Sequence, residues 1–362
     1  MNVLAYLQNL FQSSPKTKFI KELKGLDLAD AICHNLMVEK RIPGMAITIK
    51  RQGKIVLEKG YGHADLEKKI KVNPAKTLFR IASISKCITG IALAKMVEEE
   101  MVELDASFYE YVPNYPKKKY DFTLRQLASH TAGIRGYRGK EFALNKPYSI
   151  EESVEIFQND PLVFRPGKGY LYNSFDFVLL SLAMQEASGI PFETYVKTKV
   201  LEPLGMMATI PEKVTSASLS NQELVGERSQ TYTRTKMGFK KAVPVNNFYK
   251  LAGGGYLSTS SDIAKLGQAI MEKKLIQPET LKDILTAQTI NGKSTYYGLG
   301  FQVSQDDLGR DFVGHVGNSV GAYSNFFVYP NEEIVISILI NCTDPKVQND
   351  LDTVSSTQLS SF

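Results

Sequence analysis

The residues with the clearest catalytic potential are Ser83 and Lys86, which stand three positions apart in a Ser-x-x-Lys segment. At this spacing both side chains fall on the same face of a helix. The apolar neighbours Cys87, Ile88 and Ile91 predict that Lys86 is buried, and burial lowers the pKa of an ammonium group. Such a lysine can accept the proton of a serine that attacks a carbonyl. The segment therefore indicates covalent serine catalysis, with helix capping by Ser83 as the structural alternative.

Two other serine motifs compete with this segment. A second Ser-x-x-Lys occurs at residues 13–16, but it contains Pro15, which does not suit the interior of a helix. Residues 317–321 match the Gly-x-Ser-x-Gly pattern around Ser319. That pattern requires a catalytic histidine later in the chain, and His315 is the last histidine. Both competitors are therefore weaker than Ser83.

Metal and phosphate chemistry have little support in the sequence. The four histidines, none at a metal-ligand spacing from another, are His34, His63, His130 and His315. The chain has three cysteines, too few for a disulfide framework, and no His-Glu-x-x-His motif. The glycines 253–255 predict a tight turn and not a phosphate-binding loop, because no lysine follows in the required position. We expect no metal and no cofactor, and a structural role for His130.

The composition is that of an enzyme-sized globular protein. The chain has 362 residues, of which 43% are hydrophobic, and its 43 basic and 38 acidic residues give a net charge of +5. This charge is spread along the chain, which argues against a nucleic-acid binder. No apolar run reaches the length of a membrane span. Residues 1–11 are too polar for a secretory signal and predict an amphipathic helix docked on the body. Compartment and oligomeric state have no readable signal.

The two ends of the chain predict strands and helices that must position the site. Residues 45–62 and 325–340 each read as a β-hairpin. A helix is expected at residues 26–39, and another is expected to begin at Asp344 as N-cap, with Pro345 at its first position. The apolar face of this last helix would be Val347, Leu351 and Val354.

The middle of the chain has a helical pattern. Helices are predicted at residues 84–100, 124–127, 150–157, 175–187 and 263–271. Residues 211–249 are polar and predict a long surface excursion. We therefore expect a single domain over residues 1–362. Its mixed lobe would comprise residues 20–82 and 255–362, with a helical lobe at 83–254 and a site at the seam.

Residues 79–86, Phe-Arg-Ile-Ala-Ser-Ile-Ser-Lys, resemble the active-site segment of the serine β-lactamase and penicillin-binding-protein superfamily. The chain looks most like the branch of class C β-lactamases, D-alanyl-D-alanine carboxypeptidases and family VIII esterases, from about residue 42 to residue 341. The other matching pieces, in order, are residues 42–44, 60–62, 129–133, 166–167, 203–206, 253–255, 297–300 and 315–317. The resemblance implies a mixed α/β (α+β) fold of β-lactamase/transpeptidase type, with an antiparallel sheet flanked by the terminal helices and an inserted helical lobe.

The resemblance also implies roles for the first two motifs. Ser83 and Lys86 match the nucleophile and its lysine. The second motif is usually Tyr-x-Asn, and the register set by residues 166–167 places Tyr172 at the tyrosine and Ser174 at the asparagine. A serine is shorter than an amide and has one donor where the amide has two. Contacts of Ser174 to Lys86 and to a substrate amide are therefore altered.

The third motif, Lys-Thr-Gly in most β-lactamases, is His315-Val316-Gly317 in this chain. The resemblance implies that His315 and Gly317 line the cleft with Asn318. It also implies that the backbone N–H groups of Ser83 and Asn318 form an oxyanion hole. A neutral imidazole attracts a carboxylate less than an ammonium does, which makes efficient β-lactam hydrolysis less favourable.

The function implied is a serine hydrolase that forms an acyl-enzyme on small-molecule or peptide substrates. The scissile bond would be an ester or amide, in a D-amino-acid peptide or a β-lactam-like compound, and the peptidase or esterase type is favoured over an efficient β-lactamase. The alternative is a catalytically weakened penicillin-binding or scaffold protein on the same fold, motivated by Ser174. Substrate choice would reside in cleft-edge loops at residues 137–147 and 211–249.

Overall fold

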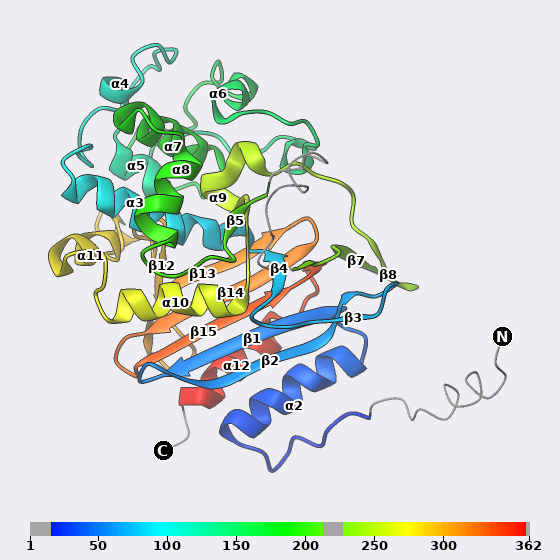
Figure 1. The fold of residues 1–362 in the computed structure, drawn as a ribbon. Coiled ribbons are helices and arrows are strands. Elements are labelled where there is room, and N and C mark those ends of the chain that lie inside the picture. The colour runs from blue at the N-terminus through cyan, green and yellow to red at the C-terminus, as the bar shows by residue number, and fades with distance from the viewer. Residues whose placement is uncertain (1–15, 213–226, 360–362) are drawn as a thin grey trace.

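A seven-stranded antiparallel sheet forms the centre of the molecule (Figure 1). The computed structural model describes residues 16–212 and 227–359. In spatial order the strands are β12 (Gln302–Gln305), β13 (Asp311–Ser319), β14 (Ala322–Tyr329), β15 (Ile334–Ile340), β1 (Gly44–Arg51), β2 (Lys54–Asp65) and β3 (Ile70–Lys71). Strand β1 pairs with β15 along its length, so that Met45 lies opposite Ile340. The expected sheet built from both chain ends is confirmed.

The β1–β2 hairpin follows from its turn residues. Gln52 and Gly53 have φ values of 48° and 76°, and a two-residue turn with both φ angles positive matches the twist of the flanking strands. Glycine adopts this conformation without steric cost. Strands β1 and β15 are almost completely buried, because helices cover both faces of the sheet.

The terminal helices cover one face of this sheet. These are α2 (Gly25–Val38) and α12 (Gln348–Leu359), which pack against each other (Figure 1). The predicted apolar face of α12, Val347, Leu351 and Val354, is buried. The predicted start of α12 was wrong. Asp344 and Lys346 have φ values of 32° and 59°, which no helix accommodates, so α12 begins only at Gln348.

The opposite face carries α10 (Ser260–Met271) and the helical region (Figure 1). The other helices are α3 (Ser85–Glu98), α4 (Phe108–Tyr111), α5 (Leu124–Ala128), α6 (Ile150–Ser153), α7 (Phe175–Ser188), α8 (Phe192–Val196), α9 (Leu251–Gly254) and α11 (Pro278–Ile284). Helix α3 is buried on nearly all sides, as expected for a helix without a polar face. Its first turn therefore places any side chain it carries inside the protein.

Short strands complete the described structure. They are β4 (Thr77–Arg80), β5 (Ile210–Pro211), β6 (Glu227–Arg228), β7 (Tyr232–Thr235), β8 (Gly238–Lys241), β9 (Tyr256–Ser258), β10 (Thr289–Ile290), β11 (Lys293–Ser294) and β16 (Cys342–Thr343).

Some local predictions lie partly or wholly outside the described residues, and others need correction. The excursion at residues 211–249 contains the β7–β8 hairpin, and its residues 213–226 lie outside the described residues, as does the expected N-terminal helix. Helix α6 ends at Ser153 and continues as a 3-10 turn. Gly253 and Gly254 belong to α9 and do not form a tight turn, because the preceding residues of this segment are buried and helical.

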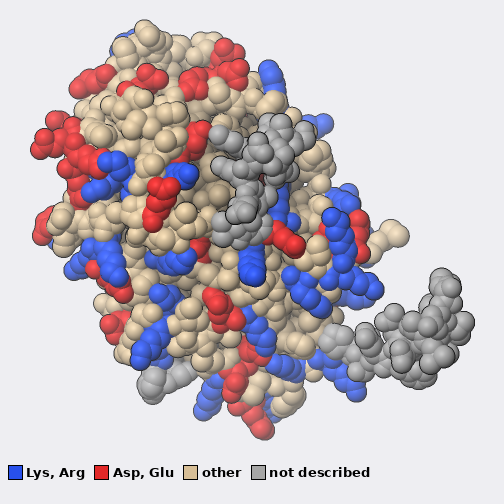
Figure 2. Space-filling view, viewed as in Figure 1, with Lys and Arg blue, Asp and Glu red and all other residues tan. Residues whose placement is uncertain are grey.

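The surface carries both signs of charge. Basic and acidic side chains are interspersed over the face in Figure 2, without a continuous basic stripe. None of the helices in residues 16–212 and 227–359 is long and apolar enough to cross a membrane.

Candidate active site

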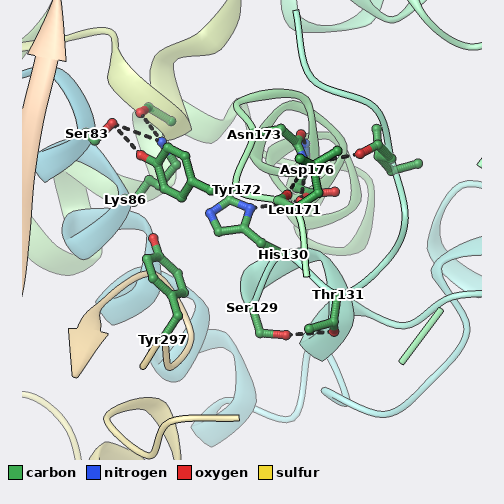
Figure 3. Close-up of polar contacts among 12 residues, drawn as sticks. Ser83, Lys86, Ser129, His130, Thr131, Leu171, Tyr172, Asn173, Asp176 and Tyr297 are labelled. Atoms are coloured by element: carbon green, nitrogen blue, oxygen red, sulfur yellow. Dashed lines mark hydrogen bonds and ion pairs between the residues drawn. The ribbon is translucent and has the colours of Figure 1, made fainter. Parts of the chain in front are cut away.

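Three predicted residues meet at the hydroxyl of Ser83 (Figure 3). Ser83 lies in a 3-10 turn, Ala82–Ile84, between β4 and α3, and Lys86 follows in the first turn of α3. Lys86 Nζ lies 3.2 Å from Ser83 Oγ. The Tyr172 hydroxyl, 89 residues along the chain, lies 2.6 Å from the same Oγ. The structure thus brings a hydroxyl, an amine and a phenol within hydrogen-bond distance.

Lys86 is completely enclosed by protein. Its exposed fraction is 0%, and its Nζ donates a hydrogen bond of 2.8 Å to the carbonyl oxygen of Gly253. The rings of Tyr172 and Phe177 lie 4.8 and 5.3 Å from Nζ. Burial lowers the pKa of Lys86 to about 7, although Cys87 and Asp176 oppose this shift. At neutral pH a large fraction of Lys86 is therefore an unprotonated amine that can act as a base.

Tyr172 presents its hydroxyl to Ser83 while 40% of the residue remains exposed. Burial of the phenol raises the pKa of Tyr172, so the hydroxyl keeps its proton at neutral pH and donates to Ser83 Oγ. The ring of His130 packs edge-on against it, with ring centroids 4.6 Å apart, and Tyr297 lies 6.0 Å away (Figure 3). This packing fixes the direction of the hydroxyl.

Behind Tyr172 lies a buried polar network. His130 Nδ1 lies 2.8 Å from Asp176 Oδ2, and both side chains are completely buried. Asn173 Nδ2 donates to the same carboxyl oxygen at 2.6 Å, and the Asp176 N–H donates to Asn173 Oδ1 at 2.8 Å. Burial lowers the pKa of His130 and raises the pKa of Asp176, which favours their neutral forms. These contacts support the structural role predicted for His130.

Ser174 lines a cavity together with Ser83. The cavity has a volume of about 90 Å³ and is lined by Ala82, Ser83, Tyr137, Phe142, Ser174, Lys250, Gly253, Gly254, Asn318, Ser319 and Val320. Lys86 Nζ donates to the carbonyl oxygen of Gly253. Among the described contacts, no hydrogen bond joins Lys86 to Ser174. Two larger hollows, of about 470 and 440 Å³, lie elsewhere and do not include Ser83.

The third motif lies on β13. The ring of His315 is buried and is not among the residues that line the cavity: its Nε2 faces the Tyr297 hydroxyl at 2.9 Å, and its Nδ1 lies 2.6 Å from the carbonyl oxygen of Val316. Burial and the nearby Lys86 lower the pKa of His315 to about 3, so the imidazole is neutral. The His315 ring lies against the rings of Tyr172 and Tyr297, with centroids 5.7 and 5.6 Å away, and its expected contact with substrate stays a prediction.

Gly317 and Asn318 bring β13 against the nucleophile turn. A Cβ atom at Gly317 would lie 2.2 Å from Ser324 Oγ and 2.7 Å from the carbonyl oxygen of Ile81, so only glycine permits this approach. Ser324 Oγ also donates to that carbonyl oxygen at 2.9 Å. Asn318, the next residue, lines the cavity beside Ser83.

A buried cluster of charged side chains lies next to the turn that carries Ser83. Arg80 Nε lies 2.8 Å from Glu212 Oε1, and its Nη1 donates to the carbonyl oxygen of Val320 at 2.7 Å. Glu212 has no exposed side-chain surface and also bonds Arg228 and Asn247. The cluster links β4, three residues before Ser83, to the cavity wall at Val320.

Replacement of Glu212 by glutamine is expected to lower the free energy of unfolding by about 3 kcal/mol, because it leaves Arg80 buried without a counter-charge. Thermal unfolding measures this change. Glu67→Gln is the control, since Glu67 forms an exposed ion pair with Lys241 and its loss should leave the unfolding midpoint close to that of the wild type. Equal midpoints for Glu212→Gln and the wild type would contradict the structural role of the cluster.

Within residues 16–212 and 227–359, no group of three or more His, Cys, Asp or Glu side chains is arranged to hold a metal ion.

Residues 29–358 match the model of the protein family described as Beta-lactamase. The chain belongs to the Beta-lactamase family. This confirms the resemblance predicted from the ordered motifs. The match spans the sheet, the terminal helices and the helical region.

Curated relatives and solved structures agree with this assignment. The chain is 27% identical to the human "Serine beta-lactamase-like protein LACTB, mitochondrial", covering 85% of this chain and 73% of that protein. It is 26% identical to "Protein flp" of Staphylococcus aureus, covering 90% of this chain and 65% of that protein. The octameric penicillin-binding protein homologue from Pyrococcus abyssi aligns with a TM-score of 0.75 at 25% identity, over 88% of this chain and 74% of that chain. A D-stereospecific amidohydrolase from Streptomyces shares the fold, with a TM-score of 0.75 at 20% identity over 89% and 97% of the two chains.

Sequence reasoning missed three residues at this site of a Beta-lactamase family member. Lys250 lines the cavity. The one sequence signal for its burial is its position between apolar residues, just before the glycines 253–255. Asp176 and Glu212 were missed because their partners lie 46 and 132 residues away.

Proposed function

We propose that this Beta-lactamase family member is a serine hydrolase that forms an acyl-enzyme on Ser83. The observation that carries the proposal is the position of Ser83 Oγ, 3.2 Å from a buried amine and 2.6 Å from a protonated phenol. A nucleophile in contact with its base is the arrangement that covalent catalysis requires.

In the first step Ser83 attacks the carbonyl carbon of an ester or amide. Lys86 accepts the serine proton as a neutral amine, because its pKa lies at about 7. Tyr172 keeps its own proton at neutral pH and bridges the serine and the leaving group, so it passes a proton to the leaving alcohol or amine while Lys86 restores the proton to Tyr172. The carbonyl carbon is then bonded to Ser83 Oγ.

The negative charge on the carbonyl oxygen needs stabilisation in this step. We assign this role to the backbone N–H groups of Ser83 and Asn318, two residues that line the same cavity. In the second step water attacks the acyl carbon and gives its proton to Lys86. The bond to Ser83 Oγ then breaks, Ser83 Oγ recovers the proton from Lys86, and the carboxylic acid is released.

The substrate class follows from the third motif. At the third-motif position, where most β-lactamases have a lysine, the buried His315 is neutral and supplies no positive charge. Solved relatives of this fold include a D-stereospecific amidohydrolase and a D-amino acid amidase. Both points favour peptidase, amidase or esterase activity over efficient β-lactam hydrolysis.

A substrate panel tests this function. Nitrocefin, a D-Ala-D-Ala peptide and short-chain esters are assayed with the wild type and with Ser83→Ala. We expect turnover of an ester or peptide that depends on Ser83, with slower nitrocefin hydrolysis. Equal turnover by both proteins, or no turnover of any substrate, would contradict the proposal.

The pH dependence of kcat/KM should follow Lys86. As a base, Lys86 acts when unprotonated, so kcat/KM for an ester is expected to fall about tenfold per unit below pH 6 and to level off above about pH 8. Titratable groups near Lys86 include Cys87, Asp176, His130 and His315, each favoured in its neutral form by burial. Lys250 also interacts with Lys86, and its own pKa is lowered to about 8. A flat profile from pH 5 to pH 9 would exclude Lys86 as the base.

A further inference from the structure

A second lysine lines the cavity beside Ser83. Lys250 stands directly before α9 and is only 7% exposed. Its Nζ donates to the carbonyl oxygen of Phe142 at 3.1 Å and lies 5.4 Å from the centroid of the Tyr137 ring. Phe142 and Tyr137 themselves line the cavity. The ammonium group is therefore held at the cavity wall by groups that are part of that wall.

Among the described residues, Lys250 has no carboxylate partner. In the described part of the chain no Asp or Glu forms an ion pair with it, and the acid that influences it, Glu212, is bonded to Arg80 and Arg228. Burial, Arg80 and Lys86 together lower the pKa of Lys250 to about 8. As far as the described residues go, the inner wall of the cavity thus has positive character without a negative partner.

A buried ammonium group without a counter-charge is unfavourable, and a ligand carboxylate relieves this by a charge-assisted hydrogen bond. We propose that the cavity binds an acyl group that ends in a carboxylate, with Lys250 as its anchor. The inference rests on the proposed function, since it assigns the acyl part of the substrate that Ser83 attacks.

The size of the cavity limits the length of the acyl group that it can bind. A volume of about 90 Å³ has room for several water molecules, and so for a short acyl chain. Ser174 adds a polar side chain to its lining. Monoesters or monoamides of short dicarboxylic acids, such as a succinyl group, have the required chemistry.

Two esters of equal shape test the proposal. Ethyl hydrogen succinate and ethyl 4-methylpentanoate differ in that two methyl groups replace the carboxylate oxygens. We expect the wild type to prefer the succinate ester in kcat/KM, measured by ethanol release. Lys250→Met is expected to reduce this preference about 10- to 100-fold, the loss of one charge-assisted hydrogen bond. An unchanged preference in Lys250→Met would overturn the proposal.

Lys118→Met is the matched control. Lys118 Nζ also donates to a backbone carbonyl, that of Asp160, and lies 5.4 Å from the Tyr115 ring, but it is not part of the Ser83 cavity. This variant is expected to keep the wild-type preference between the two esters. An equal loss of preference in both lysine variants would point to overall charge and overturn the role of Lys250.

Binding to the Ser83→Ala protein separates this inference from the proposed function. By calorimetry, ethyl hydrogen succinate should bind at least tenfold more tightly than the neutral ester, and adding Lys250→Met should abolish the difference. Equal binding of both esters would overturn the Lys250 proposal whatever the turnover. Selective binding without any turnover by the wild type would support Lys250 and contradict the acyl-enzyme.

Discussion

Replacement of Ser83 by alanine is expected to lower kcat/KM for the best ester or peptide by about 10⁴-fold or more. The acyl-enzyme forms on Ser83 Oγ, and without this atom only binding and oxyanion stabilisation remain. The fold should be retained, because the Ser83 side chain contacts only the site residues Lys86 and Tyr172 among the hydrogen bonds described. Its removal enlarges a cavity that Ser83 already lines. Steady-state kinetics measures the loss, and circular dichroism checks the fold.

Ser319→Ala is the matched control for this variant. Ser319 lines the same cavity and lies in the competing Gly-x-Ser-x-Gly pattern. It is expected to keep kcat/KM within about tenfold of the wild type, well short of the loss of a nucleophile. A collapse of activity in Ser319→Ala, with activity retained in Ser83→Ala, would move the nucleophile to β13.

The second large effect is expected for Lys86→Met, which should lower kcat/KM about 10³-fold. This change removes the base that contacts Ser83 Oγ, and general base catalysis contributes about 10² to 10⁴-fold. Methionine fills a similar volume and suits the buried position, so the free energy of unfolding should change little. The rise of kcat/KM through about pH 7 should disappear with the amine.

Lys95→Met controls for loss of a lysine from the same helix. Lys95 lies near the end of α3, where its Nζ is 3.6 Å from Glu98. Its kcat/KM and pH profile should match those of the wild type. Activity of Lys86→Met within tenfold of the wild type, with the pH profile intact, would exclude Lys86 as the base.

Local sequence patterns predicted the main elements of the fold because their signals are short-range. The hairpins and the apolar helices could be predicted from neighbouring residues alone. The arrangement of a central sheet covered by helices was then inferred from these elements. The start of α12 could not be predicted, since the left-handed backbone at Asp344 and Lys346 depends on how the chain leaves β16. The glycines of α9 were misjudged because packing overrides their low helix propensity.

In the candidate site, too, residues close together in sequence were predictable and those that depend on distant packing were not. Ser83 and Lys86 are three residues apart, and their geometry follows from helix periodicity. Tyr172 needed the family resemblance, because the chain folds back over 89 residues to reach Ser83. The burial of His315 and the exposure of Lys250 to the cavity depend on side-chain packing between distant segments, which no local pattern encodes.

The central claim, a covalent acyl-enzyme on Ser83, is tested most directly by mass spectrometry of the protein after exposure to a fluorophosphonate. We predict a single adduct per chain, mapped by peptide fragmentation to Ser83 and absent from Ser83→Ala. The Ser319→Ala protein should be labelled like the wild type. No adduct on the wild-type protein, or an adduct on a residue other than Ser83, would contradict the account.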